Sequence, residues 1–235
     1  KKTGVVILTV KYHGHSVLSF NSNDTDVIID PFISGNELTD LTAADVKADY
    51  IILTHGHNDH VGDTIDIAKN NDATVIAPVE LANYLDGQGL KTVGMNTGGE
   101  GEYEFGKVKF VHAFHTSSFT DEDGVAHYTG EPMGLILTIN GKKVYVTGDT
   151  GLFGDMELIS KTNGPIDVCF IPIGDHFTMG VDDAAYAVNK LIKPIIAVPV
   201  HYDTFPPIKQ DPEDFKNKID TACQILKPGQ AVEFS

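Results

Sequence analysis

The sequence lacks the features that mark several large classes of protein. It contains no apolar run that approaches the about 18–20 residues needed for a membrane-spanning helix. The lysines at positions 1 and 2 precede only a short apolar stretch at residues 5–8, which is too short for the apolar region of a secretory signal. We therefore expect neither a membrane protein nor an exported one.

Cysteine is scarce in this chain. The 235 residues include two cysteines, Cys169 and Cys223, and no Cys-x-x-Cys motif. This excludes a disulfide-stapled secreted scaffold and predicts a cytoplasmic protein. Cys169 lies inside an apolar run at residues 168–171, so we expect a buried free thiol there.

Basic side chains are outnumbered by acidic ones. There are 17 lysines and arginines against 33 aspartates and glutamates, and the formal net charge is −16. Such a surface repels phosphate backbones, so no nucleic-acid partner is expected. A small phosphorylated substrate remains compatible with this charge, because bound divalent cations reverse its sign locally. The glycine-rich residues 94–101 lack the GxxxxGK[ST] pattern and a following helix, which predicts a surface turn.

Short β-branched runs alternate with polar segments and with helical patterns along the whole chain. Strands are expected at residues 5–11, 17–20, 27–30, 49–54, 74–77, 108–114, 134–139, 142–147, 168–172, 195–199, 225–227 and 231–234. Helices are expected at residues 42–46, 62–70, 79–85, 155–161, 182–192 and 212–222. The simplest architecture is one domain over residues 1–235, an α+β sandwich (αββα) with two mixed sheets face to face and helices outside.

Two connections in the second half of the chain have distinct signatures. Asn140-Gly141 between two apolar runs is the strongest short signal for a β-hairpin. Residues 116–131 form a polar segment that is too long for a simple hairpin and is typical of a lid or a site wall.

A cluster of metal-ligating side chains follows the predicted strand at residues 49–54. It reads His55-x-His57-x-Asp59-His60, and these donors suit Zn, Mn, Fe and Ni. In an extended segment His55 and His57 share a face and can bind one ion. Asp59 and His60 point apart unless the backbone turns. We expect Gly56 and Asn58 to provide that turning freedom, so that the cluster serves two ions before a helix begins at Val61-Gly62.

Three further donors stand at the ends of predicted strands. They are His115, Asp149 and His201, each directly after or close to an apolar run. The carboxyl ends of such strands are where open α/β sheets place their sites. The absence of thiolate ligands favours a catalytic site over a structural one.

These motifs, in this order along nearly the whole chain, resemble the metallo-β-lactamase superfamily. The resemblance implies an αββα fold and two divalent ions. It implies that one ion is held by His55, His57 and His115. It implies that the second is held by Asp59, His60 and His201, with Asp149 bridging the two.

Smaller features narrow the resemblance to one branch. Gly14-His15-Ser16 and residues 172–180 and 199–206 are similar to uncharacterised bacterial metal-dependent hydrolases related to the L-ascorbate-6-phosphate lactonase-like group. The segment His115-Thr116-Ser117-Ser118 departs from the HTxGS pattern common elsewhere in the superfamily. This departure weakens analogies about substrate and leaves the metal ligands unaffected.

Other polar residues allow more than one interpretation. His15 and His176 are either packing histidines or substrate contacts beside the metals, and His176 is a candidate catalytic residue with Asp59 and Asp149. Asp30 either orients a ligand histidine or merely ends a strand. We expect structural roles for His13 and His112 and a solvated side chain for His127.

The predicted activity is hydrolysis of an ester, lactone or phosphodiester of a small molecule. A hydroxide on two dications about 3.5–4 Å apart would be the nucleophile. Zn is the favoured metal, and Mn, Fe or Ni is compatible with these ligands. A non-catalytic metal-dependent binding protein is the alternative. A diiron redox protein is less favoured, because such members carry Glu where this chain has His57. The sequence leaves a homo-oligomer open.

Overall fold

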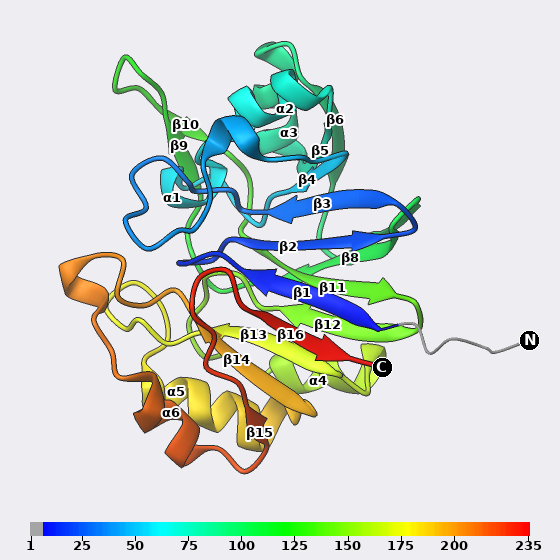
Figure 1. Cartoon of the computed structure of the whole chain (residues 1–235). Coiled ribbons are helices and arrows are strands. Elements are labelled where there is room, and N and C mark those ends of the chain that lie inside the picture. Colours follow the sequence, from blue (N-terminus) through cyan, green and yellow to red (C-terminus); the bar gives the residue numbers. More distant parts are fainter. Residues whose placement is uncertain (1–6) are drawn as a thin grey trace, which may run out of the picture.

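Two seven-stranded mixed sheets packed face to face form the centre of the protein, as the sequence predicts (Figure 1). The computed structural model describes residues 7–235, so Val5 and Val6 of the first predicted strand lie outside the described residues. The first sheet has the order β16 (Ala231–Phe234), β1 (Leu8–Tyr12), β2 (Leu18–Ser22), β3 (Thr25–Ile29), β4 (Tyr50–Ile52), β5 (Thr74–Pro78) and β6 (Lys91–Met95).

The second sheet repeats this plan with its own order of strands. It runs β15 (Ala222–Cys223), β14 (Ile196–Val200), β13 (Val168–Pro172), β12 (Lys142–Val146), β11 (Met133–Ile139), β8 (Gly106–His112) and β7 (Glu100–Tyr103). In each sheet a parallel set, β3 to β6 or β12 to β15, adjoins an antiparallel set. The predicted hairpin is confirmed, with Asn140 and Gly141 at φ 50° and 78° between β11 and β12.

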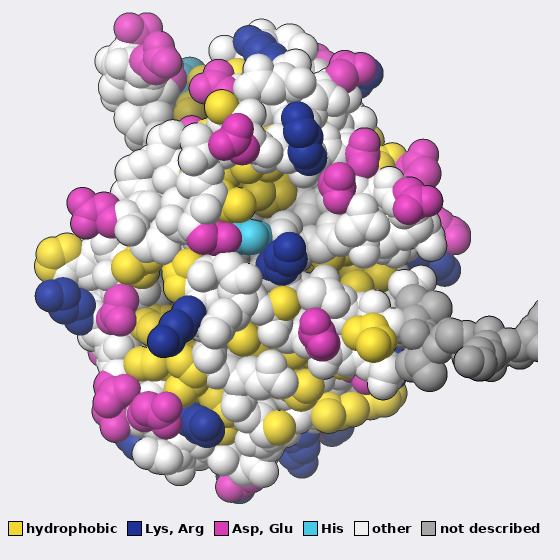
Figure 2. Space-filling view, viewed as in Figure 1, with side chains coloured by type: hydrophobic (Ala, Val, Ile, Leu, Met, Phe, Trp, Pro, Cys, Tyr) yellow, Lys and Arg dark blue, Asp and Glu magenta, His cyan; other side chains and the backbone are white. Residues whose placement is uncertain are grey.

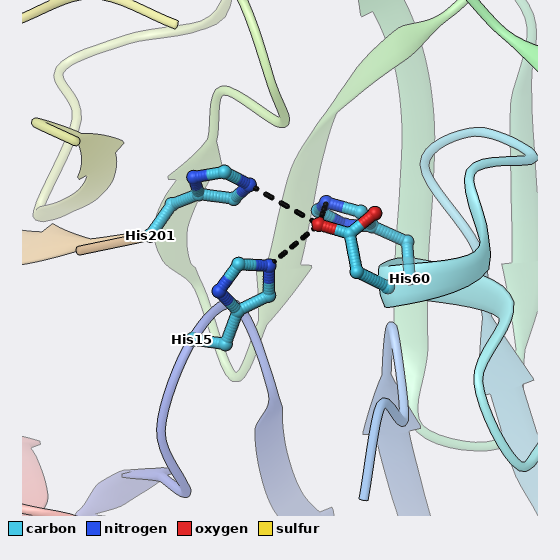
Figure 3. Close-up of side chains that lie close together, drawn as sticks. His15, His60 and His201 are labelled. Atoms are coloured by element: carbon cyan, nitrogen blue, oxygen red, sulfur yellow. Dashed lines mark hydrogen bonds and ion pairs between the residues drawn. The ribbon is translucent and has the colours of Figure 1, made fainter. Parts of the chain in front are cut away.

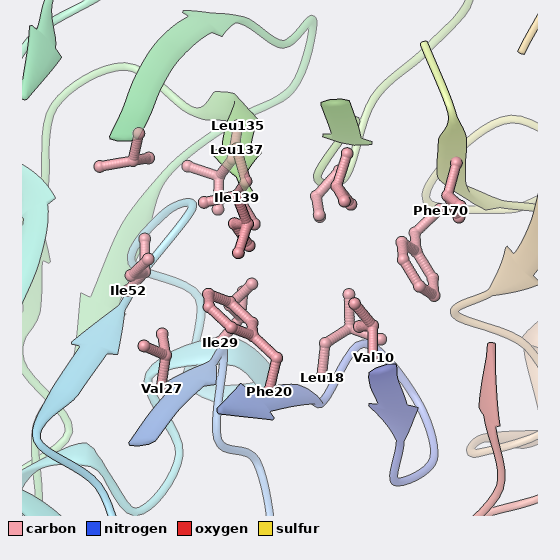
Figure 4. Close-up of a cluster of buried hydrophobic side chains, with 14 of the residues drawn as sticks. Val10, Leu18, Phe20, Val27, Ile29, Ile52, Leu135, Leu137, Ile139 and Phe170 are labelled. Atoms are coloured by element: carbon pink, nitrogen blue, oxygen red, sulfur yellow. The ribbon is translucent and has the colours of Figure 1, made fainter. Parts of the chain in front are cut away.

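The core lies between the two sheets. Figure 4 shows side chains of β1 to β4 pointing toward those of β11 and β13. Alternate residues share a face of a strand, so Phe170 joins this inner cluster while Cys169 and Ile171 pack on the outer side of β13. The expectation of a buried free thiol at Cys169 is therefore confirmed.

Helices cover the outer faces of both sheets, as expected. The first sheet carries α2 (Thr64–Asn71) and α3 (Val79–Gly87), and the second carries α4 (Met156–Asn163), α5 (Val181–Tyr186), the π-helical η2 (Ala187–Ile192) and α6 (Pro212–Lys218). Short helical turns are η1 (Ala43–Asp45), α1 (Asn58–Val61) and η3 (Pro206–Ile208). Within residues 7–235, no helix is both long and apolar enough to cross a bilayer.

Several predicted boundaries are wrong. The segment 116–131 is a hairpin after all, with β9 (Ser118–Thr120) antiparallel to β10 (Ala126–Tyr128). Asp121 stabilises its turn by accepting hydrogen bonds from the backbone N–H groups of Asp123 and Val125. The strand expected at 225–227 is absent, and β15 pairs at 222–223 instead. The glycine-rich turn is shorter than predicted, because Gly94 and Gly101 lie within β6 and β7.

Candidate metal centre

The loops that carry the predicted donors gather at one end of the two sheets, on the left in Figure 1. His55 and His57 follow β4, Asp149 follows β12, and His201 follows β14. These strands belong to the parallel sets, whose carboxyl ends lie at a common edge. His115 comes three residues after β8 ends. Its segment is tied to the Asp149 loop, because Gly151 N–H donates to the Phe114 carbonyl.

The cluster after β4 turns by a mechanism that differs from the prediction. Asn58 to Val61 form the helical turn α1, on which Asp59 Oδ2 and His60 Nε2 lie 3.6 Å apart, and Gly62 at φ 45° ends it. Gly56 is required for close approach instead, because an added Cβ would lie 2.0 Å from Thr129 Oγ1. Asn58 therefore lies in the turn as predicted, whereas the assignment of the turn to Gly56 is wrong.

The first group of donors consists of His55, His57 and His115. One ring nitrogen from each lies within 4.8 Å of the others. His55 Nε2 and His57 Nδ1 are 3.0 Å apart. Burial, with the neighbouring histidines, lowers the pKa of all three imidazoles. Neutral imidazoles with converging nitrogens are the form that binds a metal ion.

The second group consists of His15, Asp59, His60 and His201, whose donor atoms also lie within 4.8 Å of one another. Figure 3 shows His15 and His201 directed at a carboxylate oxygen beside His60. The Oδ2 atom of Asp59 is 2.8 Å from His15 Nε2, 3.5 Å from His201 Nε2 and 3.6 Å from His60 Nε2. Burial opposes ionisation of Asp59, but the His60 charge and the bond from His15 outweigh it and lower this pKa.

Asp149 lies between the two groups. Its Oδ2 atom is 3.0 Å from the Nε2 atoms of both His60 and His201. The same oxygen is 3.7 Å from His115 Nε2 and 3.8 Å from His55 Nε2. Although Asp149 is buried, the neighbouring histidines hold its pKa well below the ordinary value. One ionised carboxylate thus faces donors of both groups.

Asp30 and Thr54 set the orientation of two histidines from behind. Asp30 Oδ2 lies 2.8 Å from His60 Nδ1, and its carboxylate accepts hydrogen bonds from both the N–H and the hydroxyl of Thr54. Since that hydroxyl donates to Asp30, it accepts from His55 Nδ1 at 2.9 Å. Both imidazoles are thereby held with Nδ1 protonated and Nε2 facing the site. Of the two interpretations of Asp30, the structure supports the one in which it orients a ligand histidine and not the one in which it merely ends a strand.

The chemistry of these donors fits divalent metal ions. Both ring nitrogens of His201 are buried without a hydrogen-bond partner of acceptable geometry, although its Nε2 lies 3.0 Å from Asp149. Burial lowers the pKa of His201, but the Asp149 charge outweighs it and raises this pKa to about 9. Packed imidazoles around two carboxylates without thiols are typical of transition-metal sites.

The remaining histidines lie in different surroundings. His15 is fully buried and bonded to Thr204 and Asp59, which makes it a candidate ligand or positioning residue, not a substrate contact. Burial lowers the pKa of His15 to about 4. His176 is exposed, packs edge-on against Phe177, and is not brought to either group.

Three more histidines stay outside the centre. His13 is buried between Asp40 and Ser19, and His112 is exposed beside Phe153. His127 was expected to be solvated, but it is half-buried, lies 2.6 Å from an oxygen of Asp121 and packs on Tyr84.

A cavity of about 640 Å³ opens onto the donors. Its walls include Phe177, Phe205 and Pro207, from the loops after β13 and β14. Sequence reasoning missed these three residues. Phe177 and Phe205 lie in the segments 172–180 and 199–206 that carry the resemblance, but an aromatic residue in a polar loop does not by itself indicate a cavity wall.

Comparison with known proteins gives consistent results. The profile of the family described as "Beta-lactamase superfamily domain" matches residues 25–202. A UPF0173 metal-dependent hydrolase from Staphylococcus carnosus is 56% identical over 230 residues, which cover 97% of this chain and 100% of that protein.

Solved structures show the same likeness. A metallo hydrolase named Igni18, from Ignicoccus hospitalis, is 32% identical with a TM-score of 0.86 and covers 98% of this chain and 99% of its own. A metal-dependent hydrolase described as putative in Parabacteroides distasonis is 25% identical with a TM-score of 0.72, covering 94% of this chain and 93% of that one. The finer likeness to ascorbate-6-phosphate lactonases stays a prediction.

Proposed function

This chain belongs to the β-lactamase superfamily and is a metal-dependent hydrolase, and from that membership we propose a centre of two divalent ions that hydrolyses an ester, lactone or phosphodiester bond. One ion would be held by His55, His57 and His115. The other would be held by Asp59, His60 and His201, with Asp149 shared between them. The ions would supply a nucleophile at neutral pH and polarise the substrate oxygen.

The position of Asp149 is the observation that carries this proposal. Its Oδ2 atom lies within 3.8 Å of four imidazole nitrogens that belong to two separate donor groups. A single ion could not use all seven proposed ligands, His55, His57, His115, Asp59, His60, His201 and Asp149, because four to six ligands fill its coordination sphere. Zn is the metal that we favour, since histidine and aspartate donors without thiolates are typical of its catalytic sites.

Residues of the chain itself orient and protect the reacting groups. Asp59 is in part exposed at the cavity, so its carboxylate can accept a hydrogen bond from a nucleophilic water and orient it. His15 holds this carboxylate in place, and Thr204 in turn holds His15. His176 is not included among the proposed catalytic residues, because it lies outside the cavity that Phe177 lines.

The test combines metal counting with activity. Wild-type protein reconstituted with Zn should contain two ions per chain, and Asp149→Asn and His57→Ala should hold fewer and lose hydrolysis of nitrophenyl esters or bis-nitrophenyl phosphate. Asp40→Asn is the matched control, because Asp40 pairs with His13 outside the centre. One ion per chain at saturation would refute the dinuclear proposal. If Zn-saturated protein hydrolyses no ester, lactone or phosphodiester, the alternative of a non-catalytic metal-dependent binding protein would be favoured.

A further inference from the structure

The cavity beside the donors has walls that indicate what part of a substrate it receives. We propose that this site takes substrates whose group beyond the reacting bond is apolar and uncharged, such as a hydrophobic acyl chain, and disfavours groups that carry a phosphate or carboxylate there. This inference rests on the proposed hydrolase function, because it specifies the substrate of that same site.

The apolar wall comes from two neighbouring loops. Phe177 lies between β13 and α5, and Phe205 and Pro207 follow β14. Phe177 is 54% exposed. Removal of a phenylalanine ring from water is favourable, so this exposure leaves stabilisation unused. An apolar substrate group that covers this ring would provide that burial.

The Phe205 side of the wall is held in place before any substrate binds. The Phe205 ring packs edge-on against His15, with centroids 5.4 Å apart, and lies 6.1 Å from the ring of Phe32. The next two residues are prolines with fixed φ, and Ile208 N–H donates to the Phe205 carbonyl. A preformed wall loses little conformational entropy on binding, which favours a rigid apolar contact.

The cavity offers no cation to an anionic group away from the metals. All 17 basic residues of the sequence are lysines, and none of those described within residues 7–235 lines this cavity. Its acidic residues are Asp59 and Asp149, which belong to the donor groups. The chain has no arginine to form the bidentate contact that recognises phosphate or carboxylate. A distant negative charge would therefore be desolvated without compensation.

The polar residues at the rim are uncharged. Asn58 is occupied by two hydrogen bonds with the backbone of Thr120, one from its amide and one to its carbonyl oxygen. Thr116 is exposed near His57 and can contact a neutral carbonyl or hydroxyl group. Lys209 lies two residues after Pro207 and is exposed outside the cavity, so it is the nearest cation along the chain and must be tested.

The decisive comparison uses two esters of equal length. In p-nitrophenyl butyrate and p-nitrophenyl hemisuccinate the leaving group and the four-carbon acyl chain are the same, and only the second carries a terminal carboxylate. For Zn-loaded wild type we expect kcat/KM for the butyrate to exceed kcat/KM for the hemisuccinate by about tenfold or more. From acetate to butyrate to hexanoate, kcat/KM should rise about two- to fourfold for each methylene.

Substitutions in the wall test whether its two phenylalanines cause these preferences. Phe177→Ala and Phe205→Ala should both flatten the dependence on chain length, whereas Tyr186→Ala should leave it unchanged. Tyr186 is a matched control because it is an aromatic residue on α5, 53% exposed and outside the cavity. The inference is overturned if wild type cleaves the hemisuccinate as fast as the butyrate or faster. It is also overturned if Lys209→Ala cleaves the hemisuccinate more slowly than wild type does, because Lys209 would then bind the carboxylate.

Equilibrium binding separates this inference from the proposed function. By calorimetry on Zn-loaded protein, hexanoate should bind about tenfold more tightly than adipate, which adds a second carboxylate at the same length. Phe177→Ala should reduce the hexanoate affinity, and Tyr186→Ala should not. If no ester is hydrolysed while these affinities hold, the proposed activity fails and the apolar site stands. If esters are hydrolysed without these preferences, the activity stands and the apolar site fails.

Discussion

Asp30 organises the metal centre without belonging to either donor group of the proposed ions. Its carboxylate sits behind His60 and Thr54 and is almost fully buried. The residue adopts φ 46°, a left-handed conformation that is uncommon outside glycine, which lets a strand-ending side chain turn back into the loop. Carboxylates that hold a ligand histidine in this way raise its basicity as well as fixing its ring.

Replacement of this carboxylate should weaken metal binding more than it weakens the fold. In Asp30→Asn the side chain keeps its size but offers only one acceptor oxygen to His60 and Thr54. We expect Zn affinity, measured by competition with a chelator, to fall about 10- to 100-fold. Asp40→Asn alters the His13 pair outside the centre and should keep wild-type affinity. Equal Zn affinities in all three proteins would contradict an orienting role for Asp30.

The two thiols should be unreactive in the folded protein. Burial raises the pKa of Cys169 well above its ordinary value and that of Cys223 to about 11. The thiolate is the reactive form, so at pH 8 iodoacetamide should label neither residue in native protein. As the pH rises toward 11, labelling should begin at Cys223, which is only half-buried. Mass spectrometry after urea unfolding provides the control, in which both thiols react; rapid native labelling of Cys169 would contradict its burial.

At this scale the sequence was most informative where chemistry and position coincide. The seven predicted donors stand out because imidazole and carboxylate side chains follow apolar strands. His15 could not be assigned, since its partner Thr204 is 189 residues away along the chain. The exposed position of His176 was equally hidden, because adjacent residues in a loop can face different surroundings.

Among the elements, the β9–β10 hairpin is the one most directly joined to the metal loop. Asn58 on α1 exchanges two hydrogen bonds with the backbone of Thr120, and Gly56 N–H donates to Ser117 Oγ. The same hairpin projects from the molecule, and its tip carries acidic side chains (Figures 1 and 2). Its position therefore depends on these hydrogen bonds and on the packing of Phe119 and His127 against Tyr84.

Loss of the Asn58 side chain should loosen this hairpin. Asn58→Ala removes two hydrogen bonds, each contributing about 0.5–1.5 kcal/mol to the free energy of unfolding. Hydrogen exchange followed by mass spectrometry should show faster exchange over residues 118–128.

A matched control is available on the other side of the molecule. Asn189 makes the same pair of bonds, to the carbonyl of Lys218 and from the N–H of Asp220. Asn189→Ala should cost similar stability and leave exchange in the hairpin unchanged. Unaltered hairpin exchange in Asn58→Ala would show that other contacts hold it.

Predictability of the elements follows their length and regularity. The hairpin around Asn140-Gly141 and the strand Val168–Pro172 were predicted closely, because turn chemistry and a continuous apolar run determine them locally. The β9–β10 hairpin was missed because strands of three residues are too short to show alternation. The helical turn α1 was missed for a related reason: four residues contain barely one helical period.

For the whole molecule, the proposed ions connect parts of the chain that the core does not join. The donors come from the loops of both sheets, from His55 after β4 to His201 after β14. In the unfolded chain these donors are spread along the sequence and do not converge on one place. The folded state therefore binds metal in a way that the unfolded chain cannot reproduce.

Metal removal should lower thermal stability. A ligand present at a thousand times its Kd stabilises a protein by about 4 kcal/mol, which is about 8–16 °C in Tm for a chain of this size. We expect a decrease of about 10 °C, measured by calorimetry after chelation and dialysis, with recovery when Zn returns. The double variant His57→Ala/His201→Ala should not respond to chelation. An unchanged wild-type Tm would count against a loaded centre.

The order of strands also bears on how copies of the protein meet at high concentration. Among the described residues, the two seven-stranded sheets end at β16 and β6, and at β15 and β7. Exposed strand edges are templates for edge-to-edge aggregation. Here β15 has only two residues, and β7 carries Glu100 and Glu102 within four. Together with the net charge of −16, these two short or acidic edges disfavour edge-to-edge pairing of copies through β15 and β7.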